Sequence, residues 1–348
     1  MPTSAQQSSD NFPEQRDVPA PDVGVVVVTP RLSDAFFAID LEEQFLAAEY
    51  PAILRVLLAD RTTGRNIVWA TDQYAHLGWG YQPLAEITPQ VVTGVRTRVI
   101  QPRIHKAQVL RSDRTRGRGE VSTPSWLCNQ QNNQCDDVWF GRSDVFNHAG
   151  YRTWEARAEP IQFELHGGRT WQMYVDDRRM EAACGEAPYL VSRYDTTTGE
   201  SIALGRRIGL LDRKLRVVTE NASDAAEWSE WARRAFESVY GFEFQGDNLL
   251  LARENLLATY VEFAVSALGT LPSLAELARI AEIISWNLWQ MDALTGYPPL
   301  QVPLTQVDQL GFFDDERAEA VRPCRVRDWR DLEVHRYQDL GKLEAKRT

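Results

Sequence analysis

The feature that most constrains this chain is a short apolar segment that runs into a turn of small residues. It reads Arg179-Met180-Glu181-Ala182-Ala183-Cys184-Gly185-Glu186-Ala187-Pro188-Tyr189-Leu190. A strand that ends in Ala-Cys-Gly leaves backbone N–H groups without bulky side chains over them, so a ligand can approach the main chain. Open α/β sheets bind cofactors at that place, the carboxyl end of a strand. Taken alone, the segment also fits an ordinary tight turn of a packed domain.

Helical periodicity precedes and follows this segment. Apolar residues recur at helical spacing, with a restart at Pro51, and the predicted helices cover residues 41–58, 224–240, 248–268 and 274–288. The segment Phe242-Glu243-Phe244 lies between two of them and is a strand candidate. Beyond Pro298 the chain becomes loop-like and charged, and no element is predicted there.

Composition places the chain among ordinary globular proteins. Its 348 residues are 43% apolar and 25% charged, which is enough to build a sizeable core. Residues 1–22 are polar and lack the basic and apolar parts of a secretory signal, so we expect a disordered leader and a cytoplasmic protein. The apolar run at 23–28 is too short to span a membrane, so no membrane partner is expected.

The four cysteines are too few and too scattered for a disulfide framework. They are Cys128, Cys135, Cys184 and Cys324. No histidine or cysteine lies at zinc-binding spacing near the first pair, so no metal site is predicted. We expect all four to be buried thiols.

Charge is unevenly distributed along the chain. The net charge of −11 argues against a protein that coats nucleic acid indiscriminately. Residues 96–118 nevertheless form a basic segment with Asp113 as its single acid, and its candidate DNA-binding residues are Arg111, Arg114, Arg116 and Arg118. A solvated loop is the ordinary interpretation of such a run, and a strap that contacts phosphates is the alternative.

The residues after the basic segment predict a helix. Thr123-Pro124 is typical of a hydroxyl N-cap followed by proline in the first turn. The polar block at 129–133, Asn-Gln-Gln-Asn-Asn, is unusual in a helix. We expect its amides to bind neighbouring backbone or to line a polar cleft.

Several segments, in order, resemble the DNA adenine methyltransferases of restriction–modification systems. Gly119-Glu120-x-x-Thr123-Pro124 resembles the motif that precedes their cofactor domain, and residues 181–190 resemble their Asp-Pro-Ala-Cys-Gly-Ser-Gly-x-Phe-Leu turn. Glu243 with the following Leu251-Ala252-x-x-Asn255-Leu256 resembles their second-strand acid and its helix. Gln290-Met291-Asp292-Ala293-Leu294 resembles the segment that flanks adenine. A similarity over most of residues 40–300 to proteins catalogued as restriction endonuclease subunit M is more specific.

This resemblance implies an α/β fold with a Rossmann-like, S-adenosylmethionine-dependent methyltransferase core and a mainly helical N-terminal region. The implied parts are an accessory region at 23–118, the core at 119–310 and a tail at 311–348. The cofactor-binding residues that it implies are Thr123, Cys184, Gly185, Glu186, Glu243 and Asp292. Glu243 would accept from the ribose hydroxyls, with Asp212 as a rival, and Asp292 would accept from the adenine amine of the cofactor.

Two departures from the family pattern leave the function open. Gly185 is followed by Glu186-Ala187-Pro188 where the family has a second glycine, which makes the loop stiffer and charged. The (Asn/Asp/Ser)-Pro-Pro-(Tyr/Phe) motif that grips a flipped adenine is missing, because the one Pro-Pro pair reads Tyr297-Pro298-Pro299-Leu300. The chain is therefore either a methyltransferase subunit, with a restriction or specificity subunit as partner, or a non-catalytic DNA-binding module whose partner chain supplies the motif. An endonuclease is disfavoured, because no Asp…Glu-x-Lys or His-Asn-His arrangement is present.

Overall fold

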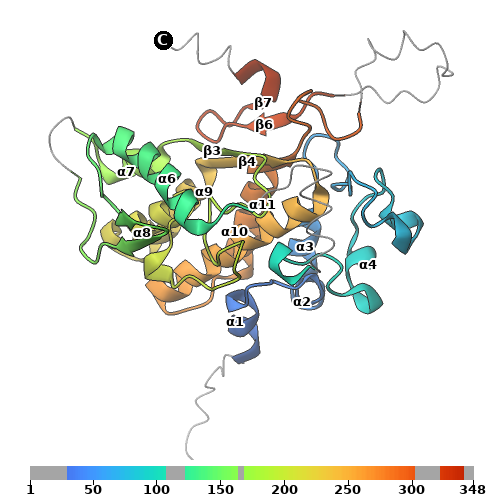
Figure 1. Cartoon of the computed structure of the whole chain (residues 1–348), viewed down its shortest axis with the longest axis horizontal. Coiled ribbons are helices and arrows are strands. Elements are labelled where there is room, and N and C mark those ends of the chain that lie inside the picture. Colours follow the sequence, from blue (N-terminus) through green and yellow to red (C-terminus); the bar gives the residue numbers. More distant parts are fainter. Residues whose placement is uncertain (1–29, 107–121, 164–167, 302–321, 341–348) are drawn as a thin grey trace, which may run out of the picture.

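A computed structural model of the chain has a parallel three-stranded sheet between a layer of helices and a short β-hairpin (Figure 1). The strands, in sheet order, are β3 (Arg179–Ala182), β4 (Val239–Glu243) and β5 (Leu288–Gln290). Ala182 lies beside Phe242, and Glu243 lies beside Gln290, so the carboxyl ends of all three strands meet at one edge. This arrangement is compatible with the predicted α/β class.

The structure describes residues 30–106, 122–163, 168–301 and 322–340. Three predicted features lie outside these ranges. They are the disordered leader at 1–22, the candidate DNA-binding residues Arg111, Arg114, Arg116 and Arg118, and Gly119-Glu120 of the motif before α6.

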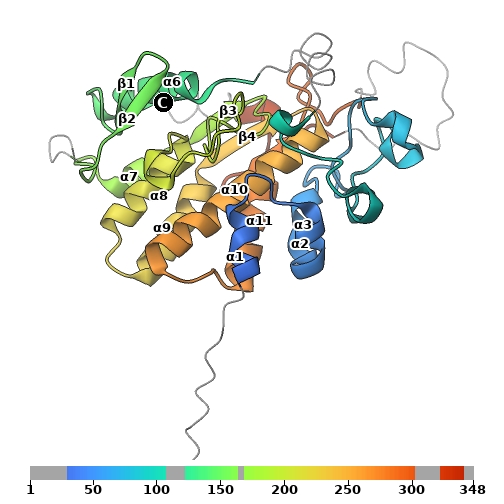
Figure 2. The same ribbon diagram turned by 60° about the horizontal axis from the view of Figure 1, so that its bottom comes forward.

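Four helices connect the parallel strands and cover one face of the sheet (Figure 2). They are α8 (Leu210–Asn221), α9 (Ala225–Glu237), α10 (Gly246–Leu268) and α11 (Leu274–Asn287). Local signals set their ends: Asp224 accepts from the N–H of Glu227 at the start of α9, and Ser273 forms a capping box with Glu276 at the start of α11. Gly269, with φ +71°, ends α10 in the left-handed conformation.

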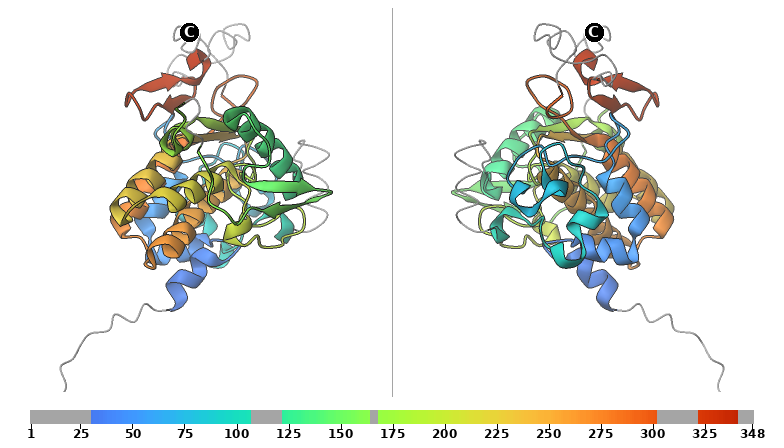
Figure 3. Two further views of the ribbon diagram at one scale, coloured as in Figure 1. Left: turned by 90° about the vertical axis from the view of Figure 1, so that its left-hand side faces the viewer. Right: turned by 90° about the vertical axis from the view of Figure 1, so that its right-hand side faces the viewer.

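The opposite face of the sheet is covered by a hairpin of β6 (Arg325–Arg327) and β7 (Val334–Arg336), as Figure 3 shows. Val326 packs there in a second core with aromatic residues of β4 and β5. The prediction that no element follows Pro298 was therefore wrong. Three-residue strands with one buried apolar residue are too short to produce a period-two signal.

The N-terminal region is mainly helical and packs against α10 and α11. Its helices are α1 (Pro30–Phe37), α2 (Glu43–Glu49), α3 (Pro51–Leu58) and α4 (Pro89–Val92), and the predicted restart at Pro51 is confirmed. Its short 3-10 turns are η1 (Ala75–Leu77), η2 (Trp79–Tyr81), η3 (Gly94–Arg96) and η4 (Arg103–His105). Two further 3-10 turns lie outside this region, η5 (Leu204–Arg206) and η6 (Tyr337–Asp339). Of the helices in the described ranges, none has both the length and the apolar content needed to cross a bilayer.

Helix α6 (Ser125–Phe140) begins one residue later than predicted. Pro124 occupies the N-cap, and the cap comes from a distant loop, where Asp195 accepts from the N–H of Ser125 at 2.7 Å. Thr123 is therefore not the cap. The expected role of the polar block is confirmed, because the amide of Asn132 donates to the carbonyls of Tyr189 and Ile208 at 3.0 and 2.9 Å.

The segment after α6 contains the hairpin of β1 (Asn147–Gly150) and β2 (Thr153–Ala156), followed by α7 (Trp171–Asp176). All four cysteines are free thiols. Three are buried, but Cys135 is exposed on α6, so the expectation that all four are buried was wrong for this residue.

Two buried carboxyl groups, one on α2 and one on α10, interact electrostatically. Glu43 and Glu254 are both buried, and neither oxygen of Glu254 has a hydrogen-bond partner. Burial, with smaller contributions from the charges of Asp40 and Glu42, raises the pKa of Glu43 to about 8. Burial, with the charge of Glu43, raises the pKa of Glu254 well above its ordinary value. The N-terminal helices therefore pack on the core through carboxyl groups that prefer to be protonated.

We predict that the free energy of unfolding falls as the pH rises from 4.5 towards 8. The folded state holds a proton on Glu43 that the unfolded state releases above its ordinary pKa of 4.5, so the contribution is complete below that value and is lost as the pH passes the raised pKa. The neutral variant Glu43→Gln should flatten this dependence by on the order of a few kcal/mol. Urea unfolding at several pH values measures it, with Glu49→Gln, an exposed acid on the same helix, as the control. Parallel curves for Glu43→Gln and wild type would contradict the prediction.

Candidate functional site

The carboxyl ends of β3 and β4 are joined by one carboxylate. Glu243 Oε2 accepts from the N–H of Gly185 at 2.9 Å, and its Oε1 accepts from the N–H of Gln245 at 3.1 Å. Gly185 has φ +54°, and a Cβ placed on it would meet no atom within 4 Å. Ala182 and Ala183 beside it are exposed. No bulky side chain therefore covers the main chain at Ala182, Ala183 and Gly185, although the N–H groups of Cys184 and Gly185 are already hydrogen-bonded within the protein.

The inner side of the turn is held by the strand that it follows. Glu181 of β3 is buried, and its carboxylate accepts from the N–H groups of Tyr189 and Leu190 at 3.4 and 3.1 Å. Burial raises the pKa of Glu181 well above its ordinary value, with a smaller contribution from the charge of Glu243. Cys184 is also buried, with its sulfur against Gly241, and burial raises the pKa of its thiol. Only the backbone of Cys184 can therefore reach a ligand.

The side chain of Glu186 is turned into the protein. Its carboxylate accepts from the N–H of Arg103 at 2.6 Å and from the hydroxyl of Tyr194 at 2.7 Å. Its backbone carbonyl accepts from the amide of Asn255 at 3.1 Å. Glu186 thus links the N-terminal region to the turn and to α10.

A polar cluster that the sequence interpretation missed lies at the start of α10. Asp247 is buried in the first turn and accepts from the hydroxyl of Tyr74 at 2.8 Å and from the ammonium of Lys106 at 3.2 Å. Asp247 lies four residues after Glu243, which is the last residue of β4. An acid in the first turn of a helix that follows a strand was the available signal, because the helix N-terminus favours negative charge.

The N-terminal region also closes the edge of the sheet beside β5. The amide of Gln290 accepts from the N–H of Val68 at 2.8 Å and donates to its carbonyl at 2.7 Å. A Cβ on Gly246 would lie 2.1 Å from the carbonyl oxygen of Val68, so glycine is required where the two segments meet. The candidate site is therefore framed by the core and by the N-terminal region together.

The remaining predicted residues have other contacts. Asp292 accepts from the N–H of Leu294 at 2.8 Å within its own turn. The rival Asp212 is buried at the start of α8, where it accepts from the N–H and hydroxyl of Ser192 at 2.7 and 2.9 Å. Thr123 lies just before α6, and its backbone carbonyl accepts from the hydroxyl of Thr196 at 3.1 Å. Contacts thus join Glu243 to Gly185, whereas Asp212 acts as a helix cap.

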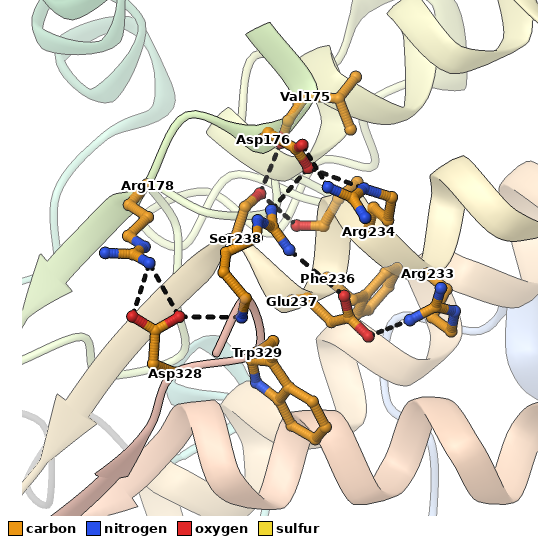
Figure 4. Close-up of polar contacts among 12 residues, drawn as sticks. Val175, Asp176, Arg178, Arg233, Arg234, Phe236, Glu237, Ser238, Asp328 and Trp329 are labelled. Atoms are coloured by element: carbon orange, nitrogen blue, oxygen red, sulfur yellow. Dashed lines mark hydrogen bonds and ion pairs between the residues drawn. The ribbon is translucent and has the colours of Figure 1, made fainter. Parts of the chain in front are cut away.

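A second cluster of polar side chains lies on the hairpin, near the amino end of β3. Asp328, Asp331 and His335 lie close enough to share an ion, with ligand atoms within 4.8 Å of one another. They line a cavity of about 600 Å³ between the sheet and the hairpin. Arg178 already holds both oxygens of Asp328 at 2.8 and 2.6 Å (Figure 4). The positive charge of this guanidinium would repel a metal ion bound to the same carboxylate.

Comparison of the chain with protein-family models, with curated proteins and with solved structures finds no match.

We predict that Glu243→Gln lowers the free energy of unfolding by about 1–3 kcal/mol, because an NH₂ group would face an N–H where an oxygen accepts now. Urea unfolding measures the change, and the exposed Glu200→Gln is the control. A variant as stable as wild type would show that the carboxylate does not hold the two strand ends together.

Proposed function

We propose that this chain binds S-adenosylmethionine at the carboxyl ends of β3 and β4 and methylates the exocyclic amine of adenine in DNA, as a cytoplasmic subunit of a restriction–modification system. The observation that carries the proposal is the contact of Glu243 with the N–H of Gly185. Two segments that resemble separate methyltransferase motifs, 58 residues apart, are in hydrogen-bond contact at adjacent ends of parallel strands. This is where open α/β sheets bind nucleotides.

The residues fit the parts of such a cofactor. The exposed Ala182 and Ala183, with the uncovered Cα of Gly185, would leave room for the methionine part. Glu243 would accept from the ribose hydroxyls. The rival Asp212 is disfavoured because its contacts are with Ser192 and Gly209 at the start of α8, whereas Glu243 contacts Gly185 itself. The wider Rossmann-like core and the roles of Thr123, Glu186 and Asp292 belong to this proposal through the resemblance.

The transfer itself needs positioning more than acid–base chemistry. When bound, S-adenosylmethionine would supply the methyl group: the carbon–sulfur bond would break with its electron pair left on sulfur as the bond to N6 of adenine forms. The amine would release one proton to water. No covalent enzyme intermediate and no metal ion are required, and no residue of this chain is assigned to take the proton.

A second candidate function is favoured by the missing target-base motif. In the segment Gly296-Tyr297-Pro298-Pro299-Leu300 the aromatic residue precedes the prolines, and the Tyr297 carbonyl accepts from Asp292 within a tight turn. The chain could then be a non-catalytic DNA-binding or scaffold module, and a partner chain would supply the Asn-Pro-Pro-Tyr motif.

We predict that Gly185→Asp abolishes binding of S-adenosylmethionine in calorimetry, because it places a carboxylate where the main chain must approach the ligand. Asparagine tolerates the same positive φ without the charge, so Gly185→Asn is the matched control and should lose less affinity. Unchanged affinity of Gly185→Asp would place the cofactor elsewhere.

A transfer assay separates the two functions. We expect tritium from labelled S-adenosylmethionine to appear in DNA when the chain is incubated alone or with its neighbouring gene products. Transfer only with a partner would support the partner-dependent function. Absence of transfer in every combination would leave the non-catalytic module.

A further inference from the structure

Three guanidinium groups share one indole ring on the hairpin side of the molecule. The Cζ atoms of Arg61, Arg325 and Arg327 lie 5.7, 5.9 and 5.9 Å from the centroid of the Trp286 ring. We call these four residues the arginine–tryptophan patch. They come from the loop after α3, from β6 and from the end of α11, so folding brings together cations that are far apart in the sequence.

Local structure orients the patch. Arg325 and Arg327 are two residues apart on β6, so they lie on one face, while Val326 between them packs into the core. The Nε of Arg61 donates to the hydroxyl of Ser285 at 2.8 Å, beside Trp286. All four residues of the patch are half-buried. Their side chains are held in place but retain access to solvent.

The charges of the patch are poorly compensated. Within the described ranges, neither Arg325 nor Arg327 forms an ion pair, and the buried Nε of Arg327 has no acceptor. Burial lowers the pKa of Arg61, where Glu282 is the opposing charge and Arg327 adds repulsion.

Neighbouring arginines show the contrast. Arg330 on the same hairpin pairs with Asp176 at 2.6 Å and with Glu237 at 3.4 Å. Arg178 pairs with Asp328 (Figure 4). Among the described residues, the patch has Glu282 opposite Arg61 but no ion pair at Arg325 or Arg327. Three guanidinium groups around one ring repel each other, and an anion between them would offset that repulsion.

We propose that the arginine–tryptophan patch binds phosphate groups of the DNA backbone. A guanidinium stacked on an aromatic ring keeps its N–H edge free for a bidentate contact with a phosphate, and stacking lowers the entropy lost on binding. The inference rests on the proposed function only in taking DNA as the substrate. The patch is separate from the predicted basic segment at 96–118.

The test compares DNA binding by the full chain and by Arg325→Gln/Arg327→Gln. Fluorescence anisotropy with a labelled duplex is measured between 50 and 200 mM salt. Loss of two phosphate contacts should reduce the slope of log affinity against log salt by about 2, so that wild type loses about tenfold more affinity than the variant over this range. The matched control is Arg142→Gln/Arg152→Gln, which removes two exposed, aromatic-stacked arginines elsewhere. It should leave the slope nearly unchanged.

Further arms make the outcome decisive. Arg325→Lys/Arg327→Lys keeps the charge but loses the guanidinium fork, so it should retain most of the salt slope while binding DNA more weakly than wild type. A retained slope in this variant also shows that substitution at these two positions does not by itself unfold the protein. An equal loss in the control variant, or an unchanged slope in the patch variant, would overturn the proposal. So would a patch variant that loses binding of inorganic phosphate but keeps its affinity for DNA. None of these readouts needs S-adenosylmethionine, so a failed methyl-transfer assay leaves the test intact.

Discussion

The arrangement of this molecule depends on one buried cation, Arg253 of α10. Its guanidinium is fully buried and donates to the carbonyls of Leu57 and Ala59 at the end of α3, and to those of Ser285 and Leu288 at the end of α11. Helix C-termini carry partial negative charge and unsatisfied carbonyls, so two of them can solvate a cation where water cannot. Burial lowers the pKa of Arg253 to about 9, which still leaves it protonated at neutral pH.

This interaction fixes the N-terminal helices to the sheet. Arg253 ties α3 to the start of β5, and the amide of Gln290 ties Val68 to the end of the same strand. The two contacts hold the accessory region along the edge of β5. Lys106 and Tyr74 can therefore reach Asp247 at the carboxyl end of the sheet. The accessory region is part of the candidate site and not a separate appendage.

The two proposed binding surfaces use different chemistry. The turn at Gly185 offers open main chain and a carboxylate, which suits a ligand with hydroxyl donors and a positive sulfonium. The arginine–tryptophan patch offers guanidinium groups, which suit phosphates. A protein that brings a cofactor and DNA together needs both kinds of surface.

Much of the local structure was predictable from the sequence. Periodicity and caps determined the long helices, the restart at Pro51 and the small-residue turn after β3, because these signals act between residues a few positions apart. The contact of Glu243 with Gly185 was only an expectation from a resemblance. Tertiary structure decided the rest: Asp195 rather than Thr123 caps α6, Glu186 points inward, and a hairpin beyond Pro298 covers the sheet. Each of these depends on partners tens to hundreds of residues away, whose proximity follows from packing and leaves no periodic signal in the sequence.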